Sequence, residues 1–205
     1  ALDLRGHGQS DKPASQYTMA EIQSDLEKAL QVLEVPEKFV LVGHSFGGAL
    51  VSEYAAAHPE RVARLVLIAT SGAYKIQPFY RFLLRFPLAA LKVIEPFTRQ
   101  WLAAPPHALK PWHQNTLSKW NGWDLFRRLS VPTVVIRGHR DNVFEKTQFE
   151  EVSRAIAGSE DVDVGSSGHM VMLERREAVN RAIERFVEEN RRTWRDQDIA
   201  TGTPA

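Results

Sequence analysis

A short apolar stretch, followed at once by a serine between glycines, most constrains how this chain can fold. The stretch is Phe39–Val42, and the sequence then reads Gly-His-Ser-Phe-Gly-Gly as far as Gly48. Such an apolar run predicts a strand buried on both faces. The helix formers of Ala49–Ala57 predict a helix that ends before Pro59, because proline cannot continue one. Ser45 is therefore expected at a strand-to-helix corner.

A corner of this kind gives Ser45 the geometry of a nucleophile. It strains the serine backbone and needs small residues two positions away on each side, which Gly43 and Gly47 provide. The N–H of Phe46 and the positive end of the following helix would face the place where an oxyanion could form. A loop glycine pair around a surface serine is the alternative, but the flanking strand and helix favour the nucleophile. His44 is interpreted as a packing residue of the turn.

Strands alternate with helices along most of the chain. Further strands are predicted at 64–69, 131–136 and 161–164, with Ala1–Leu4 as the end of another. Helices are predicted after a capping box of Thr18 and Glu21 (with Ile22, Leu26, Ala29, Leu30 and Leu33 inward), at 145–157, and from 174 to about 192. This alternation predicts an α/β fold with a mostly parallel sheet flanked by helices.

Residues 72–128 interrupt the alternation. Six prolines are expected to divide the segment into short helices, and it holds eleven aromatic and nine basic residues against two acidic ones. We therefore predict a core in two parts, 1–71 and 129–192, with a helical cap or lid at 72–128 and a flexible tail at 193–205.

Composition excludes several classes of function. The net charge of +1 gives no reason to expect nucleic acid as a partner. The chain has no cysteine, which excludes disulfides and thiolate metal sites and fits a cytoplasmic location. No window approaches the roughly 18 apolar residues of a membrane-spanning helix. His107 and His113 lack companions at metal-ligand spacing, so we predict no metal and no cofactor.

Two polar residues follow predicted strands at the edge of the sheet where Ser45 is expected. Asp141 comes after the 131–136 strand and His169 after the 161–164 strand, and the carboxyl ends of parallel strands share one edge. A serine needs a base, usually histidine, and a carboxylate to hold that imidazole. The order Ser45, Asp141, His169 fits this set. Asp141 could instead cap the helix near Glu145, and His169 could be an ordinary loop histidine. His139 is the nearest rival base.

The combination resembles the α/β-hydrolase superfamily. The segments that carry the resemblance, which extends to about residue 190, are Asp3–Ser10 (DLRGHGQS), Gly43–Gly48, Ala57–Val62, Gly138 with Asp141, and Gly168-His169. The resemblance implies Ser45 as nucleophile, His169 as base, Asp141 as its partner and the Phe46 amide in the oxyanion hole. Members that are haloalkane dehalogenases or epoxide hydrolases carry aspartate as nucleophile, so serine implies acyl transfer through an acyl-enzyme.

The resemblance also implies three strands and a helix before Asp3-Leu4. The loop after the third of those strands supplies the second oxyanion N–H in the family. We therefore expect this sequence to be an N-terminally truncated piece of a longer enzyme. Because loss of one oxyanion donor costs about 10²–10³ in turnover, we expect weak or no activity from the isolated chain.

The function expected on this basis is cofactor-free hydrolysis of small apolar carboxylic esters or related acyl compounds, as in serine esterases and lipases. Hydrolysis of a C–C bond or a lactone would use the same three residues, and a non-catalytic binding protein could keep the fold. Aromatic residues among Arg81, Arg85 and Lys92 either bury against the core or form an acyl pocket with some affinity for anionic lipid surfaces. The sequence indicates no oligomeric state.

Overall fold

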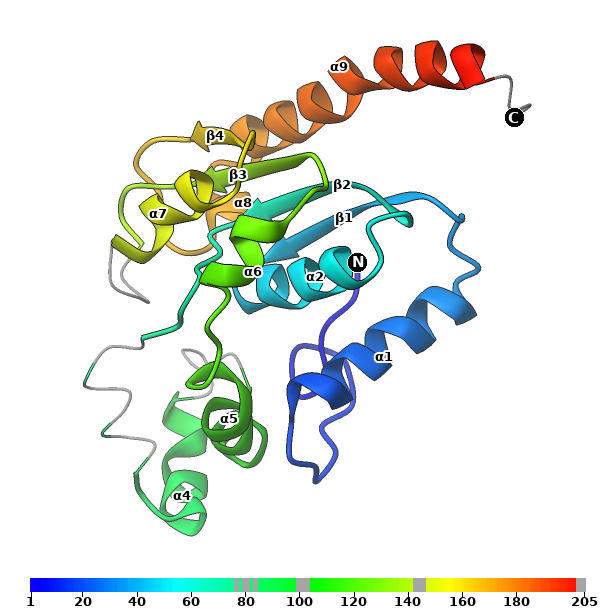
Figure 1. Cartoon of the computed structure of the whole chain (residues 1–205). Helices are drawn as coiled ribbons and strands as arrows, with labels where there is room; N and C mark the ends of the chain where they lie inside the picture. The colour runs from blue at the N-terminus through cyan, green and yellow to red at the C-terminus, as the bar shows by residue number, and fades with distance from the viewer. Residues whose placement is uncertain (76–77, 79–81, 83–84, 99–103, 142–146, 202–205) are drawn as a thin grey trace.

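The computed structural model describes residues 1–201, apart from 76–77, 79–81, 83–84, 99–103 and 142–146. Its centre is a parallel sheet of four strands in the order β1-β2-β3-β4 (Figure 1). The strands are β1 (Phe39–His44), β2 (Val62–Ile68), β3 (Thr133–Arg137) and β4 (Glu160–Asp163). The predicted α/β class and parallel sheet are confirmed.

Helices cover both faces of the sheet and bury an apolar cluster on each (Figure 1). On one face, Leu65, Leu67 and Val135 pack with side chains of α2 (Phe46–Ala57), α6 (Trp123–Arg128) and α7 (Thr147–Ala155). On the other, Val134 and Ile136 pack with α8 (Val171–Glu174) and α9 (Arg176–Thr201). Every residue of β2 is buried, so this strand lies at the centre of the core.

The helix α1 (Met19–Val32) begins at the predicted capping box. The Glu21 N–H donates to Thr18 Oγ1 at 3.3 Å, and the Thr18 N–H donates to the Glu21 carboxylate at 2.8 Å. Ile22 and Leu30 are buried on the inner face, as predicted. Leu33 is 59% exposed, contrary to prediction, because it is the C-cap residue at which the chain leaves the helix.

Two predictions about the first strands are wrong. β1 is not buried on both faces: Leu41 and Gly43 are buried, but Val42 is 48% exposed. The reason is that β1 lies at the edge of the described sheet and pairs only with β2. Residues 1–4 are not in a strand, because a strand is defined by a hydrogen-bonded neighbour and they pair with none of the described strands.

The segment between β2 and β3 leaves the sheet and returns to it at one place. An antiparallel bridge joins Ala73 to Asn121, and the Gly122 N–H donates to the Gly72 carbonyl at 2.8 Å. Between these points lie α4 (Leu88–Thr98), α5 (Pro106–Trp112) and the π-helix η1 (His113–Leu117), away from the sheet (Figure 1). We call residues 74–120 the lid.

Two details of the predicted 72–128 segment differ in the structure. The helix α6, which falls inside it, packs against α2 and α7 and buries Phe126 in the core. Pro96 and Pro111 lie within helices rather than between them. Pro111 donates no N–H, and a π-helical turn follows directly.

The C-terminal helix is longer than predicted. Ala182 and Phe186 face inward as expected, but α9 continues past Arg192 to Thr201, so 193–201 is helical. No glycine or proline, either of which could end the helix, occurs between Arg176 and Gly202. Residues 202–205 lie outside the described residues. Among the described helices, none combines the length and the apolar character that crossing a membrane requires.

Candidate active site

Ser45 sits on the predicted corner between β1 and α2. Its φ of +53° is in the left-handed region that L-residues seldom adopt. The Ser45 carbonyl accepts hydrogen bonds from the Gly48 N–H (2.9 Å), the Thr70 hydroxyl (3.2 Å) and the Tyr74 hydroxyl (2.7 Å). Burial raises the pKa of Tyr74, so the phenol stays protonated as a donor. These bonds hold the strained backbone in place.

Glycine is required at two positions around the corner, Gly43 and Gly48, whereas the prediction named Gly43 and Gly47. A Cβ on Gly43 would lie 2.6 Å from the Gly47 carbonyl oxygen, and one on Gly48 would lie 1.8 Å from Thr70 Oγ1. A Cβ on Gly47 would meet no described atom within 4 Å. The predicted steric need for glycine thus holds at Gly43 but not at Gly47, because Gly47 faces away from the packed side of α2.

The structure brings Ser45, His169 and Asp141 together. His169 Nε2 lies 2.8 Å from Ser45 Oγ, and His169 Nδ1 lies 2.5 Å from Asp141 Oδ2. A carboxylate only accepts hydrogen bonds, so Nδ1 carries the proton and Nε2 is left as the acceptor for the serine hydroxyl. Asp141 is 4% exposed, and His169 is largely buried. The geometry is that of a nucleophile, a base and an orienting acid.

Hydrogen bonds between two loops place Asp141 beside His169. The loop after β3 donates from the His139 N–H to the Gly165 carbonyl (3.0 Å) and from the Arg140 N–H to the Ser167 carbonyl (2.8 Å). Asp141 follows directly on the first loop, and His169 lies two residues past Ser167 on the second. Asp141 therefore faces His169, and the capping role considered for it near Glu145 would fall outside the described residues.

His44 contributes a contact that its sequence position did not reveal. Its Nε2–H donates to the backbone carbonyl of His169 at 2.9 Å, and the two ring centroids are 4.8 Å apart. Burial lowers the pKa of His44, which favours the neutral ring. The packing role predicted for His44 is thus accompanied by a hydrogen bond from the corner to the loop of the base. No local signal could have shown it, because the two residues are far apart in sequence.

The rival base His139 points elsewhere. Its Nε2 contacts the Asp163 carboxylate, which also pairs with Arg137 at 3.1 Å. These residues line an open groove of about 600 Å³ beside β3, β4 and α7. Arg137 also forms a two-bond pair with Asp161 at 3.0 and 3.1 Å. In this groove Arg137 pairs with Asp161 and Asp163, and His139 contacts Asp163. His139 is therefore directed into the groove rather than toward Ser45.

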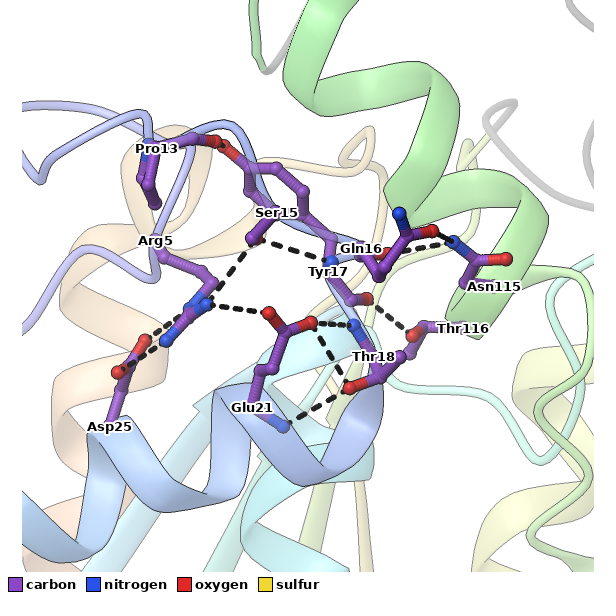
Figure 2. Close-up of polar contacts among 10 residues, drawn as sticks. All are labelled: Arg5, Pro13, Ser15, Gln16, Tyr17, Thr18, Glu21, Asp25, Asn115 and Thr116. Atoms are coloured by element: carbon purple, nitrogen blue, oxygen red, sulfur yellow. Dashed lines mark hydrogen bonds and ion pairs between the residues drawn. The ribbon is translucent and has the colours of Figure 1, made fainter.

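The lid is tied to the loop before α1, on the side shown in Figure 2. From η1, the Asn115 amide donates to the Gln16 carbonyl at 2.8 Å, and the Thr116 hydroxyl donates to the Tyr17 carbonyl at 2.6 Å. The same loop is also fixed to α1, because Arg5 pairs with Asp25 and Glu21 of that helix (Figure 2). The loop that carries the DLRGHGQS motif is therefore a fixed support for one end of the lid.

A group of aromatic side chains extends from Phe46, the residue after Ser45, into the lid. The Phe46 ring contacts Trp112 edge-on at 5.2 Å and Tyr74 at 5.9 Å between centroids. His7 also packs edge-on against Trp112, at 5.0 Å between centroids. His7 thus lies beside the aromatic group near Ser45. Among the described residues, no group of three or more His, Asp or Glu side chains could hold a metal ion.

The fold is that of an α/β hydrolase. Residues 1–124 match the family model described as the alpha/beta hydrolase fold, and the chain belongs to that family. It is similar to the AB hydrolase superfamily protein YisY of Bacillus subtilis, with 27% identity over 213 residues that span 90% of this chain and 79% of YisY. Protein ABHD8 of Homo sapiens is 26% identical over 214 residues, which span 91% of this chain and 48% of that longer protein.

Solved structures give the same family. A hydrolase from Pseudomonas aeruginosa PA01 superposes with a TM-score of 0.73 at 27% identity, covering 91% of this chain and 78% of that one. A thermophilic esterase from Thermogutta terrifontis gives a TM-score of 0.70 at 26% identity, with the same coverage of 91% and 78%. The comparisons support a hydrolase.

Proposed function

We propose that this chain is a serine hydrolase that cleaves carboxylic esters or related acyl compounds through an acyl-enzyme. The observation that carries the proposal is the continuous hydrogen-bonded path from Ser45 through His169 to Asp141. The similarity to a solved esterase at 26% identity supports the ester as the bond that is cleaved.

In the proposed reaction, Ser45 Oγ attacks the acyl carbonyl carbon while His169 Nε2 accepts the hydroxyl proton. The single bond between the acyl carbon and the alcohol oxygen then breaks, and the alcohol leaves with that proton. A water molecule next gives its proton to His169 and adds its oxygen to the acyl carbon. Ser45 is released with the proton, and the carboxylic acid departs. Asp141 accepts the hydrogen bond from His169 Nδ1–H and stabilises the imidazolium in both halves of the reaction.

The Phe46 N–H is proposed to stabilise the oxyanion that forms in each half. It is the first amide of α2, a helix of twelve residues, and it lies next to the nucleophile. Unpaired N–H groups and the positive end of the dipole make a helix start favourable for negative charge. The neighbouring rings of Phe46, Tyr74 and Trp112 favour an apolar acyl group.

A fluorophosphonate probe tests this proposal directly. An activated serine displaces fluoride and forms an Oγ–P bond, which intact-mass spectrometry detects. We expect a single adduct on the unmodified chain and none on Ser45→Ala. Ser118→Ala, which removes an exposed hydroxyl of the lid, should label like the unmodified chain. Absence of labelling on the unmodified chain, or persistent labelling of Ser45→Ala, would contradict the proposal.

We also propose that the far end of the lid associates with anionic lipid bilayers. Exposed apolar side chains gather there: Phe82 (59%), Phe86 (41%), Leu88 (36%) and Val93 (74%). The helix α4 lies at the end of the molecule remote from the sheet (Figure 1). Arg85 lies between the two phenylalanines, and residues 72–128 carry nine basic against two acidic side chains. Apolar groups beside basic ones suit an anionic membrane surface.

Vesicle co-sedimentation tests this association. We expect binding to phosphatidylglycerol-containing vesicles that weakens several-fold in the double variant Phe82→Ser/Phe86→Ser and at high salt. The matched control is Val32→Ser/Leu33→Ser, which removes two exposed apolar side chains at the end of α1. Equal binding to neutral phosphatidylcholine vesicles, or equal loss in both double variants, would argue against a role for this surface.

A further inference from the structure

Trp112, the last residue of α5, has a buried polar atom that the fold does not use. The side chain is 9% exposed, and its indole Nε1–H finds no hydrogen-bond partner among the described residues. Buried polar groups in proteins are nearly always paired, because an unpaired donor has lost its hydrogen bonds to water. An unpaired N–H in a native structure therefore calls for a functional explanation.

The position of Trp112 suggests what that explanation is. Its ring contacts Phe46, the residue that directly follows the nucleophile, at a centroid distance of 5.2 Å. His7 packs edge-on against the same indole at 5.0 Å, and Tyr74 packs against Phe46 in turn, so the surroundings are largely aromatic. Burial lowers the pKa of His7, so that ring is neutral as well. A hydrogen bond formed in such surroundings is stronger than one formed in water.

A second buried tryptophan of the lid shows that this environment does not leave indoles unpaired in general. Trp120 is also 9% exposed, but its Nε1–H donates to the Ser71 carbonyl at 3.3 Å. The two side chains are of the same type and equally buried, and they differ in whether the fold itself supplies an acceptor. Among the described residues, Trp120 has an acceptor and Trp112, which contacts Phe46, has none.

We propose that the Trp112 N–H is a substrate-binding donor and that the substrate carries a neutral acceptor oxygen in its acyl chain. This inference rests on the proposed hydrolase function and specifies its substrate class: keto-acyl or alkoxy-acyl compounds are preferred over plain alkyl esters. An indole N–H donates and cannot accept, so it selects a substrate atom that accepts hydrogen bonds over an ammonium group, which only donates. The aromatic surroundings disfavour a charged group, so the acceptor is a neutral oxygen such as that of a ketone or an ether.

A pair of nearly isosteric esters tests the proposal. 4-Nitrophenyl pentanoate and 4-nitrophenyl 3-methoxypropanoate differ by one CH₂ exchanged for oxygen, and the ratio of their kcat/KM values measures recognition of that oxygen. We expect Trp112→Phe, which keeps an aromatic ring but removes the N–H, to lower the methoxy-to-alkyl ratio about 10-fold. Comparing ratios between variants cancels the intrinsic reactivity of the two esters.

Trp120→Phe is the matched control, and thermal unfolding is the second measurement. Trp120→Phe should lower the Tm, because it removes a hydrogen bond of the fold, but leave the ester ratio unchanged. Trp112→Phe should change the ratio with a smaller effect on the Tm. An unchanged ratio in Trp112→Phe, or a Tm loss as large as that of Trp120→Phe, would overturn the proposal. Labelling of Ser45 by the fluorophosphonate in the same preparation shows whether the hydrolase function itself still stands.

Discussion

Replacing His169 with alanine is expected to lower kcat/KM for an activated ester such as 4-nitrophenyl butanoate by about 10⁴-fold or more. The physical reason is that Ser45 loses its only described base: His169 Nε2, at 2.8 Å from Oγ, accepts the proton that would otherwise stay on the attacking hydroxyl. Initial rates, together with the rate of fluorophosphonate labelling, measure the effect. The double variant Ser45→Ala/His169→Ala should be no slower than either single variant, because the two groups act as a unit.

His139→Ala is the control for this prediction. His139 follows β3, contacts Asp163 and is more than half exposed, so its removal should change the rate by no more than about twofold. If His169→Ala keeps more than a tenth of the activity, His169 is not the base. If His139→Ala and His169→Ala lose activity equally, the loop geometry rather than proton transfer accounts for the loss.

The elements around the site could be predicted because the signals for them are local. Phe39–Val42 and Ala49–Ala57 mark a strand and a helix by composition alone, and Pro59 marks the end of the helix. Once strands are assigned, parallel topology brings their carboxyl ends to one edge, which is why residues as distant as Ser45 and His169 could be expected to meet. That expectation needs only the order of strands, and the hydrogen bonds of His169 to Ser45 and Asp141 join the three side chains.

What could not be predicted depends on contacts between distant segments. The bond from His44 to the His169 carbonyl and the unpaired N–H of Trp112 have no local signature. Val42 reads as a core residue, but its exposure is decided by which strands pair beside it. The extension of α9 to Thr201 has a local signal, because no glycine or proline occurs between Arg176 and Gly202.

Gly43→Ala is expected to destabilise the corner strongly, because the added Cβ would meet backbone atoms as well as a side chain. The added Cβ would lie 2.5 Å from a Val51 methyl group, and 2.6 Å from both the Gly47 carbonyl oxygen and the Gly48 Cα. Two of these three atoms are backbone, so the start of α2 would have to move away from β1. We expect a loss of about 3 kcal/mol in the free energy of unfolding, or a Tm lower by roughly 6–12 °C.

The same shift would displace the nucleophile, because Ser45 lies between the strand and the helix that are pushed apart. A displacement near 1 Å costs on the order of 10² in rate, which should appear as slower fluorophosphonate labelling of Gly43→Ala well below its Tm. Gly47→Ala is the matched control, since its Cβ would meet no described atom within 4 Å and alanine favours the helix. It should leave the Tm unchanged or raise it. Equal losses in the two variants would mean that the packing of α2 on β1 is not what holds Ser45 in its strained conformation, and that the corner depends instead on the hydrogen bonds to the Ser45 carbonyl.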